Sequence, residues 1–174
     1  MRKVIFGGAI SLDGFLARPD HSVDWLLWGP EAAAAMADWW KSFDTVLMGR
    51  KTYEFAARSG RGGGSPGMET FVFSRTLGDE LPAGVTLVRG EAADFVRDLK
   101  AQPGKDICLM GGGELARSLF EADLIDVVGF NVHPVLLGAG IPTFHPMSRQ
   151  IDLELIECRP FSNGCVYATY RVKR

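Results

Sequence analysis

Two glycine-containing junctions hold the residues of this chain that are best suited to chemistry. The stretch DTVLMGRKTYE, residues 44–54, and the stretch DICLMGGGELA, residues 106–116, each join an apolar run to a helix-like segment through glycine. A strand that enters a helix in this way leaves backbone N–H groups unpaired at the positive end of the helix dipole, which suits phosphate. Two such junctions in one small domain predict a ligand with more than one phosphate group, such as a dinucleotide.

The second junction brings three consecutive glycines to a predicted helix start. Gly111, Gly112 and Gly113 precede Glu114 and Leu115, and without Cβ atoms they let the backbone approach a pyrophosphate closely. The pattern is not GxGxxG, and no acidic residue follows on a second strand at the distance that a Rossmann unit requires. For this junction taken alone, a tight turn that needs glycine is an equal alternative.

The first junction adds cationic side chains to the glycine. Gly49 is followed by Arg50, Lys51 and Thr52, so two positive charges and a hydroxyl group meet at a predicted helix start. We expect Thr52 to be the N-cap residue, with the two cations just outside the helix. Taken alone, the same residues also suit a capped surface helix whose basic side chains are solvated.

Hydroxyl and guanidinium groups follow two further predicted strands. Ser74, Arg75 and Thr76 come after an apolar FVF run, and Arg89 ends the run VTLV. Because the carboxyl ends of parallel strands share one edge of a sheet, we expect these groups to lie near Arg50. Arginine binds phosphate through paired N–H donors, so the cluster predicts a site for an extra phosphate monoester, such as the 2′-phosphate of NADP.

Five motifs in sequence order carry a resemblance to a known family. They are GGAISLDGFLA, VLMGRKTYE, FVFSRT, LMGGGELARSL and HPVLLGAGIPTF. The chain resembles the dihydrofolate-reductase-like superfamily, and more closely the branch with the C-terminal reductase domain of the riboflavin-biosynthesis deaminase-reductase. The resemblance implies a three-layer α/β/α sandwich around a mixed sheet of about eight strands. It also implies NADPH as the cofactor and a homodimer as the assembly.

The resemblance further implies roles for individual positions. Residues 49–52 and 74–76 would hold the adenosine 2′-phosphate and the neighbouring phosphate, and residues 111–115 would hold the pyrophosphate. Ala9 and Leu16 would lie beside the nicotinamide. The implied activity is hydride transfer from NADPH to a small heterocyclic, imine or carbonyl substrate, similar to that of 5-amino-6-(5-phosphoribosylamino)uracil reductase.

The chain departs from true dihydrofolate reductases at the first helix. Those enzymes carry a carboxylate there, and counting back from Gly49 without gaps puts that position at or near Ala33. The nearest acids, Glu31 and Asp38, miss the position, so dihydrofolate is disfavoured as the substrate. Two non-enzymatic functions stay open: a dinucleotide-binding protein without a proton donor, and a purely structural dimeric domain.

Candidate substrate residues follow the first predicted strand. Asp13, in the loop at residues 11–14, could orient a substrate or relay a proton through water, although an Asp-Gly pair is also a strong turn signal. Trp25 and Trp28 could form the walls of a pocket for a flat ring. We assign Ser11 to the same substrate pocket.

The predicted elements arrange these residues on a mixed sheet. Runs rich in Val, Ile, Phe and Leu predict strands at residues 3–10, 44–49, 70–74, 85–88, 106–111, 125–135, 151–158 and 165–172. Helices are predicted at residues 31–41, 52–58, 91–101 and 113–122. Strands and helices alternate up to residue 122, which favours parallel pairing, whereas the last strands should form an antiparallel edge. We therefore expect one α/β domain spanning residues 1–174.

Composition argues against several classes of protein. A formal charge of −2 gives no support for nucleic-acid binding through bulk charge, and no segment approaches the ~20 apolar residues of a membrane span. No pair of histidines has metal-ligand spacing with a third acid, so we predict no metal site. The three cysteines lack CxxC spacing and indicate reduced thiols in a cytoplasmic protein. Separately, we expect the partner of this protein to be a small-molecule substrate.

Two local features complete the expectations. Asn163-Gly164 predicts a two-residue hairpin turn, which would put Cys158 opposite Thr169. The segment RSGRGGGSPG, residues 58–67, has the composition of a surface loop.

Overall fold

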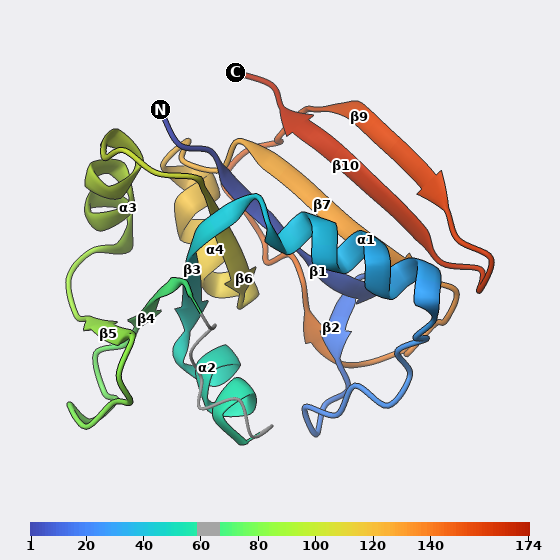
Figure 1. Ribbon diagram of the computed structural model, residues 1–174, viewed down its shortest axis with the longest axis horizontal. Coiled ribbons are helices and arrows are strands. Elements are labelled where there is room, and N and C mark those ends of the chain that lie inside the picture. Colours follow the sequence, from blue (N-terminus) through green and yellow to red (C-terminus); the bar gives the residue numbers. More distant parts are fainter. Residues whose placement is uncertain (59–66) are drawn as a thin grey trace.

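Short apolar runs alternate with helix-forming segments, and they assemble into one mixed sheet with helices on both faces (Figure 1). The computed structural model describes residues 1–58 and 67–174. Most of the loop predicted at residues 58–67 therefore lies outside the described residues.

Eight strands form the main sheet and two short strands form a second one. The strands are β1 (Val4–Ser11), β2 (Phe15–Ala17), β3 (Phe43–Gly49), β4 (Glu69–Phe73), β5 (Val85–Val88), β6 (Asp106–Gly111), β7 (Val127–His133), β8 (Ile141–Pro142), β9 (Leu153–Pro160) and β10 (Val166–Val172). The main sheet has the order β5-β4-β3-β6-β1-β7-β10-β9, and β2 pairs with β8. The helices are α1 (Pro30–Trp40), α2 (Arg50–Ala56), α3 (Ala92–Ala101) and α4 (Gly113–Glu121).

The strand directions confirm the predicted mixed sheet. In the run β5-β4-β3-β6-β1-β7 every adjacent pair of strands is parallel. Strand β10, in contrast, is antiparallel to both β7 and β9. The antiparallel edge follows from the sequence because no helix separates β9 from β10, and a hairpin reverses the chain. The parallel strands bring their carboxyl ends to one edge of the sheet, where the loops into α2 and α4 lie (Figure 1).

Two apolar clusters lie on opposite faces of the sheet. One cluster joins β1, β3 and β6 to α3 and α4, and its largest fully buried members include Phe6, Leu109 and Leu119. The other joins Met48 and Cys108 to Trp39 of α1 on the opposite face. Consequently α1 and α2 cover one face and α3 and α4 the other, which is the predicted three-layer arrangement.

Two short strands were missed by the sequence patterns. Strand β2 pairs antiparallel with β8, so that Phe15 lies opposite Pro142 and Ala17 opposite Ile141. Runs this short show neither a period of two nor enough β-branched residues to stand out. They matter because they hold residues 15–17 beside the loop that precedes β9.

The hairpin between β9 and β10 differs from the predicted one. Cys158 lies opposite Ala168, not Thr169, because three residues, 162–164, form the loop. The Asn163 side-chain oxygen accepts a hydrogen bond from the Cys165 N–H at 3.0 Å, which stabilises the longer turn. The prediction of a two-residue turn was therefore wrong, and the strand register differs from the predicted one by one residue.

Candidate functional site

A cleft of about 840 Å³ runs along the carboxyl edge of the parallel strands. All but one of the residues predicted to bind a cofactor line it: Ala9, Leu16, Gly49, Arg50, Lys51, Thr52, Ser74, Arg75, Thr76, Arg89, Gly112, Gly113, Glu114 and Leu115. The exception, Gly111, is buried behind the cleft with a φ of +119°. That φ lies in a region that other residues rarely adopt, so the backbone itself requires glycine at position 111.

The glycines at the β6–α4 junction have different reasons to be glycine. A Cβ atom at Gly113 would lie 2.7 Å from the Thr143 carbonyl oxygen and 2.6 Å from the His145 ring, so packing excludes any side chain. A Cβ at Gly112 would meet only the Thr52 Oγ1 atom, at 3.8 Å. Gly112 is the N-cap residue of α4, and the space beside it is the open cleft, as close approach of an anion requires.

The β3–α2 junction corrects one prediction. Thr52 is not the N-cap residue: α2 begins at Arg50, and Gly49 caps it with extended backbone angles. Arg50 and Lys51 therefore lie in the first turn of the helix, not outside it. Because α2 has only seven residues, we assign the cationic character of this junction to its side chains, not to a helix dipole.

Arginine side chains that follow strands β3, β4 and β5 form the basic rim of the cleft. Arg50 donates to the Thr76 Oγ1 atom at 2.7 Å and lies 3.2 Å from a Glu54 carboxylate oxygen. Arg75, largely exposed, forms an ion pair with Glu91 at 2.7 Å. This arrangement brings Arg50, Thr76 and Arg75 to one end of the cleft.

The loop after β4 is held in shape by its neighbours. Arg89 donates to the carbonyl oxygens of Arg75, at 3.1 Å, and Leu77, at 2.8 Å, and forms an ion pair with Asp79 at 2.7 Å. The Ser74 hydroxyl accepts hydrogen bonds from the Thr76 and Leu77 N–H groups at 3.2 and 3.0 Å. Arg89 thus acts mainly as a support for this loop, while Arg75 is available to a ligand.

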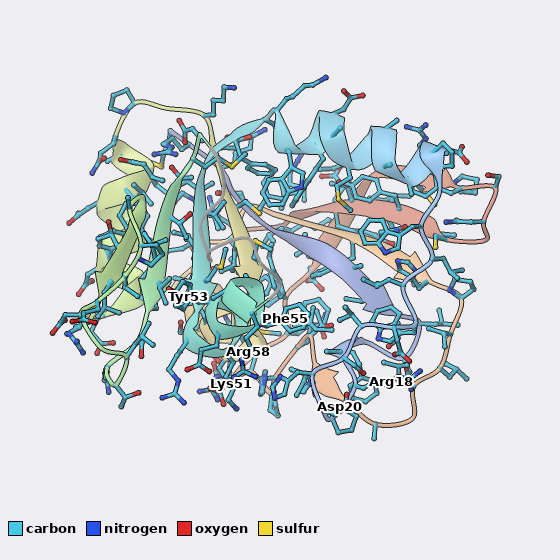
Figure 2. All side chains as sticks on the ribbon, turned by 60° about the horizontal axis from the view of Figure 1, so that its bottom comes forward. Arg18, Asp20, Lys51, Tyr53, Phe55 and Arg58 are labelled. Atoms are coloured by element: carbon cyan, nitrogen blue, oxygen red, sulfur yellow. The ribbon has the colours of Figure 1, made fainter. Side chains whose placement is uncertain are left out.

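Helix α2 forms one wall of the cleft. Figure 2 shows Lys51 and Phe55 on this helix, Arg58 just after its end, and Arg18 and Asp20 on the separate loop that follows β2. Lys51 and Phe55 both line the cleft. The wall therefore offers an ammonium group beside an aromatic ring.

A second cavity, of about 230 Å³, lies between α1 and the sheet. It shares five lining residues with the cleft: Gly7, Gly8, Ala9, Leu26 and Met110. A Cβ at Gly7 would lie 2.4 Å from the Gly129 carbonyl oxygen and 3.2 Å from the Trp39 ring, so glycine lets Trp39 lie close above β1. The two hollows are therefore neighbours along one shared wall.

Of the predicted substrate residues, only Trp28 lines this cavity. Trp25 is buried behind it, with its ring 5.3 Å from that of His133 in an edge-to-face contact. Ser11 is also buried, and its hydroxyl donates to Asp13 at 2.6 Å and accepts from the Phe15 N–H at 2.9 Å. Ser11 therefore supports the turn between β1 and β2, and neither Ser11 nor Trp25 lines either hollow.

Asp13 fixes one loop to another. Its carboxylate accepts hydrogen bonds from the Leu137 and Gly138 N–H groups at 3.1 and 2.8 Å, besides the Ser11 hydroxyl. The Ser11 hydrogen bond, followed by these backbone donors, lowers the pKa of the Asp13 carboxyl group. Asp13 lines neither hollow, and its hydrogen bonds are those of a turn-forming residue.

The first helix presents different residues to the cavity from those the sequence indicated. Ala33 is exposed to solvent, whereas Ala32, Ala35, Met36 and Trp39 line the cavity. Counting back from Gly49 without gaps therefore put the expected carboxylate position at an outward-facing residue. The adjacent residue, Ala32, is the one that faces the cavity. None of the α1 residues that line the cavity is acidic. Dihydrofolate therefore stays disfavoured as the substrate, although the residue that argues against it is Ala32 and not Ala33.

Polar residues of β7 and β10 form the far wall of the cavity and were not identified from the sequence. Asn131 and Tyr167 are cross-strand partners, and Asn131 also lies opposite Ala9 of β1. His133 is almost fully buried, and its Nδ1 atom accepts a hydrogen bond from the Leu27 N–H at 3.1 Å. Burial lowers the pKa of His133. Strand alternation alone could have placed Asn131 and His133 on one face.

Metal-binding clusters and membrane-spanning helices are both absent from residues 1–58 and 67–174. No group of three His, Cys, Asp or Glu side chains in these ranges could hold a metal ion. None of the helices formed by these residues has the length and apolar character needed to cross a bilayer. The three cysteines are free, with Cys108 and Cys165 buried and Cys158 exposed.

Comparison with known proteins agrees with this architecture. The RibD C-terminal domain matches residues 2–167. The Bacillus subtilis protein YyaP, itself uncharacterised, is 31% identical over 97% of this chain and 94% of its own length. A Shewanella sp. PV-4 structure provisionally assigned to riboflavin biosynthesis is 28% identical, covers all of both chains and superposes with a TM-score of 0.85.

The fold extends to a more distant enzyme. Dihydrofolate reductase from Enterococcus faecalis, solved with NADP(H) and RAB-propyl, is 17% identical and superposes with a TM-score of 0.71 over 99% of this chain and 97% of that chain. This likeness shows the dihydrofolate-reductase-like fold. Together the comparisons support the coarser part of the functional prediction, a reductase of the RibD type.

Proposed function

This chain belongs to the RibD C-terminal domain family, and on that premise we propose that it is a cytoplasmic, NADPH-dependent reductase. Its substrate would be a small heterocyclic, imine or carbonyl compound. The free cysteines agree with a reducing compartment.

The observation that carries the proposal is the shared wall between the two hollows. Gly7, Gly8 and Ala9 line both the larger cleft and the cavity under α1. Ligands in the two hollows would therefore meet beside residues 7–9 of β1. Hydride transfer needs this kind of arrangement, because the donor and the acceptor must be held in direct contact.

The residues of the cleft fit NADPH, whose reduced nicotinamide supplies a hydride when it is bound. Gly112 and the first turn of α4 would hold the pyrophosphate, because among the described residues a Cβ at Gly112 would meet only the Thr52 hydroxyl oxygen. Arg50, Arg75 and Thr76 would hold the 2′-phosphate through charge-assisted hydrogen bonds. Among the described residues, the Arg75 guanidinium group pairs with exposed Glu91 alone, so a phosphate could compete for it in solvent.

Two rival functions are distinguished by direct measurements. A dinucleotide-binding protein without catalysis would bind NADPH and would not oxidise it, whichever substrate is offered. A true dihydrofolate reductase would turn over dihydrofolate at ordinary enzymatic rates, on the order of 1–1,000 per second. We disfavour it because Ala32, Ala35 and Met36 offer no carboxylate to the cavity.

The test begins with binding, measured by the change in NADPH fluorescence when the protein is added. We expect NADPH to bind more tightly than NADH, which lacks the 2′-phosphate. NADPH oxidation is then followed at its absorbance band with a panel of cyclic imines, carbonyl compounds and dihydrofolate. Equal or undetectable binding of the two nucleotides would contradict the proposed cofactor.

A further inference from the structure

We propose that the cavity under α1 binds an uncharged, planar ring compound without a phosphate group, oriented by the side chains of Asn131 and Tyr167. This inference rests on the proposed function in one respect: the compound would be the hydride acceptor. It narrows the substrate to a chemical class that differs from the phosphorylated aminopyrimidine implied by the resemblance.

The walls of the cavity carry no charged side chain that could pair with an anion. None of the described residues that line it is Asp, Glu, Lys or Arg. A phosphate monoester carries about −1.5 to −2 charges near neutral pH. Placing such a group among tryptophan, alanine and methionine side chains is costly unless a cation pairs with it. The basic residues named above line the larger cleft instead, where they suit the cofactor.

The N-terminus of α1, the helix that covers the cavity, already holds a carboxylate. Its first turn contains Glu31, whose carboxylate accepts hydrogen bonds from the Ser162 N–H and hydroxyl groups, both at 2.9 Å. The Ser162 backbone and hydroxyl donors lower the pKa of Glu31, which keeps the carboxylate ionised. This carboxylate in the first turn thus offsets the positive end of the helix dipole, which could otherwise attract an anionic substrate.

The amide of Asn131 has one orientation that satisfies its neighbours. The Leu27 N–H donates to Nδ1 of His133, so the neutral imidazole carries its proton on Nε2. That Nε2 lies 3.2 Å from the Asn131 amide, and two donors cannot bond each other. The amide oxygen must therefore face the histidine. This orientation gives a partner to an oxygen that is otherwise buried and unpaired among the described residues.

Asn131 itself lines the cavity, so its amide is a polar group on that wall. Tyr167, its cross-strand partner, brings a phenol to the same wall. Burial raises the pKa of Tyr167, so its hydroxyl stays protonated and can donate as well as accept. An amide and a phenol side by side on one wall fit a ring carbonyl or a ring amide.

The remaining walls favour a flat shape. Trp28, Trp39, Trp40 and Phe161 surround the cavity with aromatic rings, and Met36 adds a flexible apolar chain. An apolar cavity of about 150 Å³ holds one benzene molecule. The 230 Å³ available here therefore suits a compound of one or two rings.

The experiment uses naphthalene probes that differ in the charge of their substituent. Their binding is measured by calorimetry with the intact protein and no cofactor. The probes are naphthalene-2-carboxamide, naphthalene-2-carboxylate and 2-naphthyl phosphate. We expect the carboxamide to bind at least tenfold more tightly than either anion. Equal or tighter binding of an anion, or no binding of the carboxamide at millimolar concentration, would overturn the proposal.

Two variants locate the binding. Met36→Arg adds a guanidinium group at a position that is 37% exposed, so the fold should survive, and it should raise carboxylate affinity at least tenfold. Asn131→Leu should weaken the carboxamide at least tenfold and leave naphthalene unchanged. A failure of both shifts would count against the cavity as the binding site.

An NADPH titration of the same samples separates the two proposals. Carboxamide binding without NADPH binding would sink the proposed function and leave this inference about the cavity standing. NADPH binding without carboxamide binding would sink this inference alone.

Discussion

At the scale of single residues, Arg75 is the side chain on which nucleotide discrimination should depend. Its guanidinium group is largely exposed at the rim of the cleft, where it forms an ion pair with Glu91. Replacing it with alanine removes a charge-assisted contact worth about 1.5–3 kcal/mol. We expect Arg75→Ala to weaken NADPH by about 10- to 100-fold while changing NADH by less than threefold, as measured by fluorescence titration.

Arg97 offers a matched control for this substitution. It is an exposed arginine paired with Asp94 at 2.7 Å on α3, and it does not line the cleft. Arg97→Ala should leave the affinities for both nucleotides unchanged. If Arg75→Ala weakened NADPH and NADH equally, the assignment of Arg75 to the 2′-phosphate would be wrong.

His133 should make stability depend on pH. Burial lowers its pKa in the folded protein below the ordinary value of 6.5, so at mildly acidic pH the unfolded chain binds a proton that the folded chain does not. The contribution of the neutral imidazole to the free energy of unfolding is therefore complete above about pH 6.5, and it is lost as the pH falls below that value. Urea unfolding at pH 7.5, 6.5 and 5.5 should show a decreasing free energy of unfolding.

The comparison variant for this effect is His133→Gln. It should lower stability at pH 7.5, because the Leu27 N–H loses its acceptor, and it should flatten the dependence between pH 7.5 and 5.5. His145→Gln should keep the slope of the original protein. An unchanged slope in the His133 variant would assign the pH effect to other groups.

At the scale of the elements, the β6–α4 junction makes the most specific demand. Gly112 has φ −80° and ψ −178°, angles that any residue adopts, and a Cβ there meets only Thr52 at 3.8 Å. Gly112→Val should therefore fold, while its methyl groups occupy the space that a pyrophosphate needs. We expect at least a 100-fold loss of NADPH affinity with a thermal midpoint close to that of the original protein.

Gly78 provides the control for a valine at a permissive glycine. It is exposed, a Cβ would meet nothing within 4 Å, and it does not line the cleft. Gly78→Val should bind NADPH normally. If Gly112→Val also bound NADPH normally, the assignment of the pyrophosphate to this junction would be wrong.

The elements also differ in how clearly the sequence signals them. The long strands and α4 were predicted because their apolar periods and glycine junctions are local signals. The start of α2 was misplaced because Gly49 caps the helix through its backbone alone, with no side-chain signal. Strands β2 and β8 were missed because their pairing, Phe15 with Pro142, joins residues far apart in the sequence.

The candidate site divides in the same way. The cleft was foreseen because each of its motifs follows a strand, and parallel strands bring their ends together. The cavity under α1 was not foreseen as a whole, since Trp28, Trp39, Asn131 and Tyr167 come from three separate regions of the chain. Which face of α1 points inward is decided by tertiary packing, and a shift of one residue exchanges exposed Ala33 for buried Ala32.

At the scale of the whole molecule, the edge of the sheet at β9 is the surface on which we expect two copies to associate. All eight residues of β9 are exposed, and Leu153, Leu155 and Ile156 are 40, 55 and 50% exposed. An edge strand with free backbone groups and apolar side chains is a ready site for pairing with another strand. We propose that a second copy of this chain pairs there through the same strand.

Sedimentation should detect this dimer as a particle of twice the 19.0 kDa chain mass at micromolar concentration. Leu155→Lys puts a charge in the centre of the proposed interface, where two-fold symmetry brings two such charges together, and should yield monomers. Leu136→Lys changes an apolar residue that is 69% exposed on the loop between β7 and β8, outside strand β9, and should leave the dimer intact. If the unaltered chain sediments as a monomer, the exposed leucines of β9 need another partner.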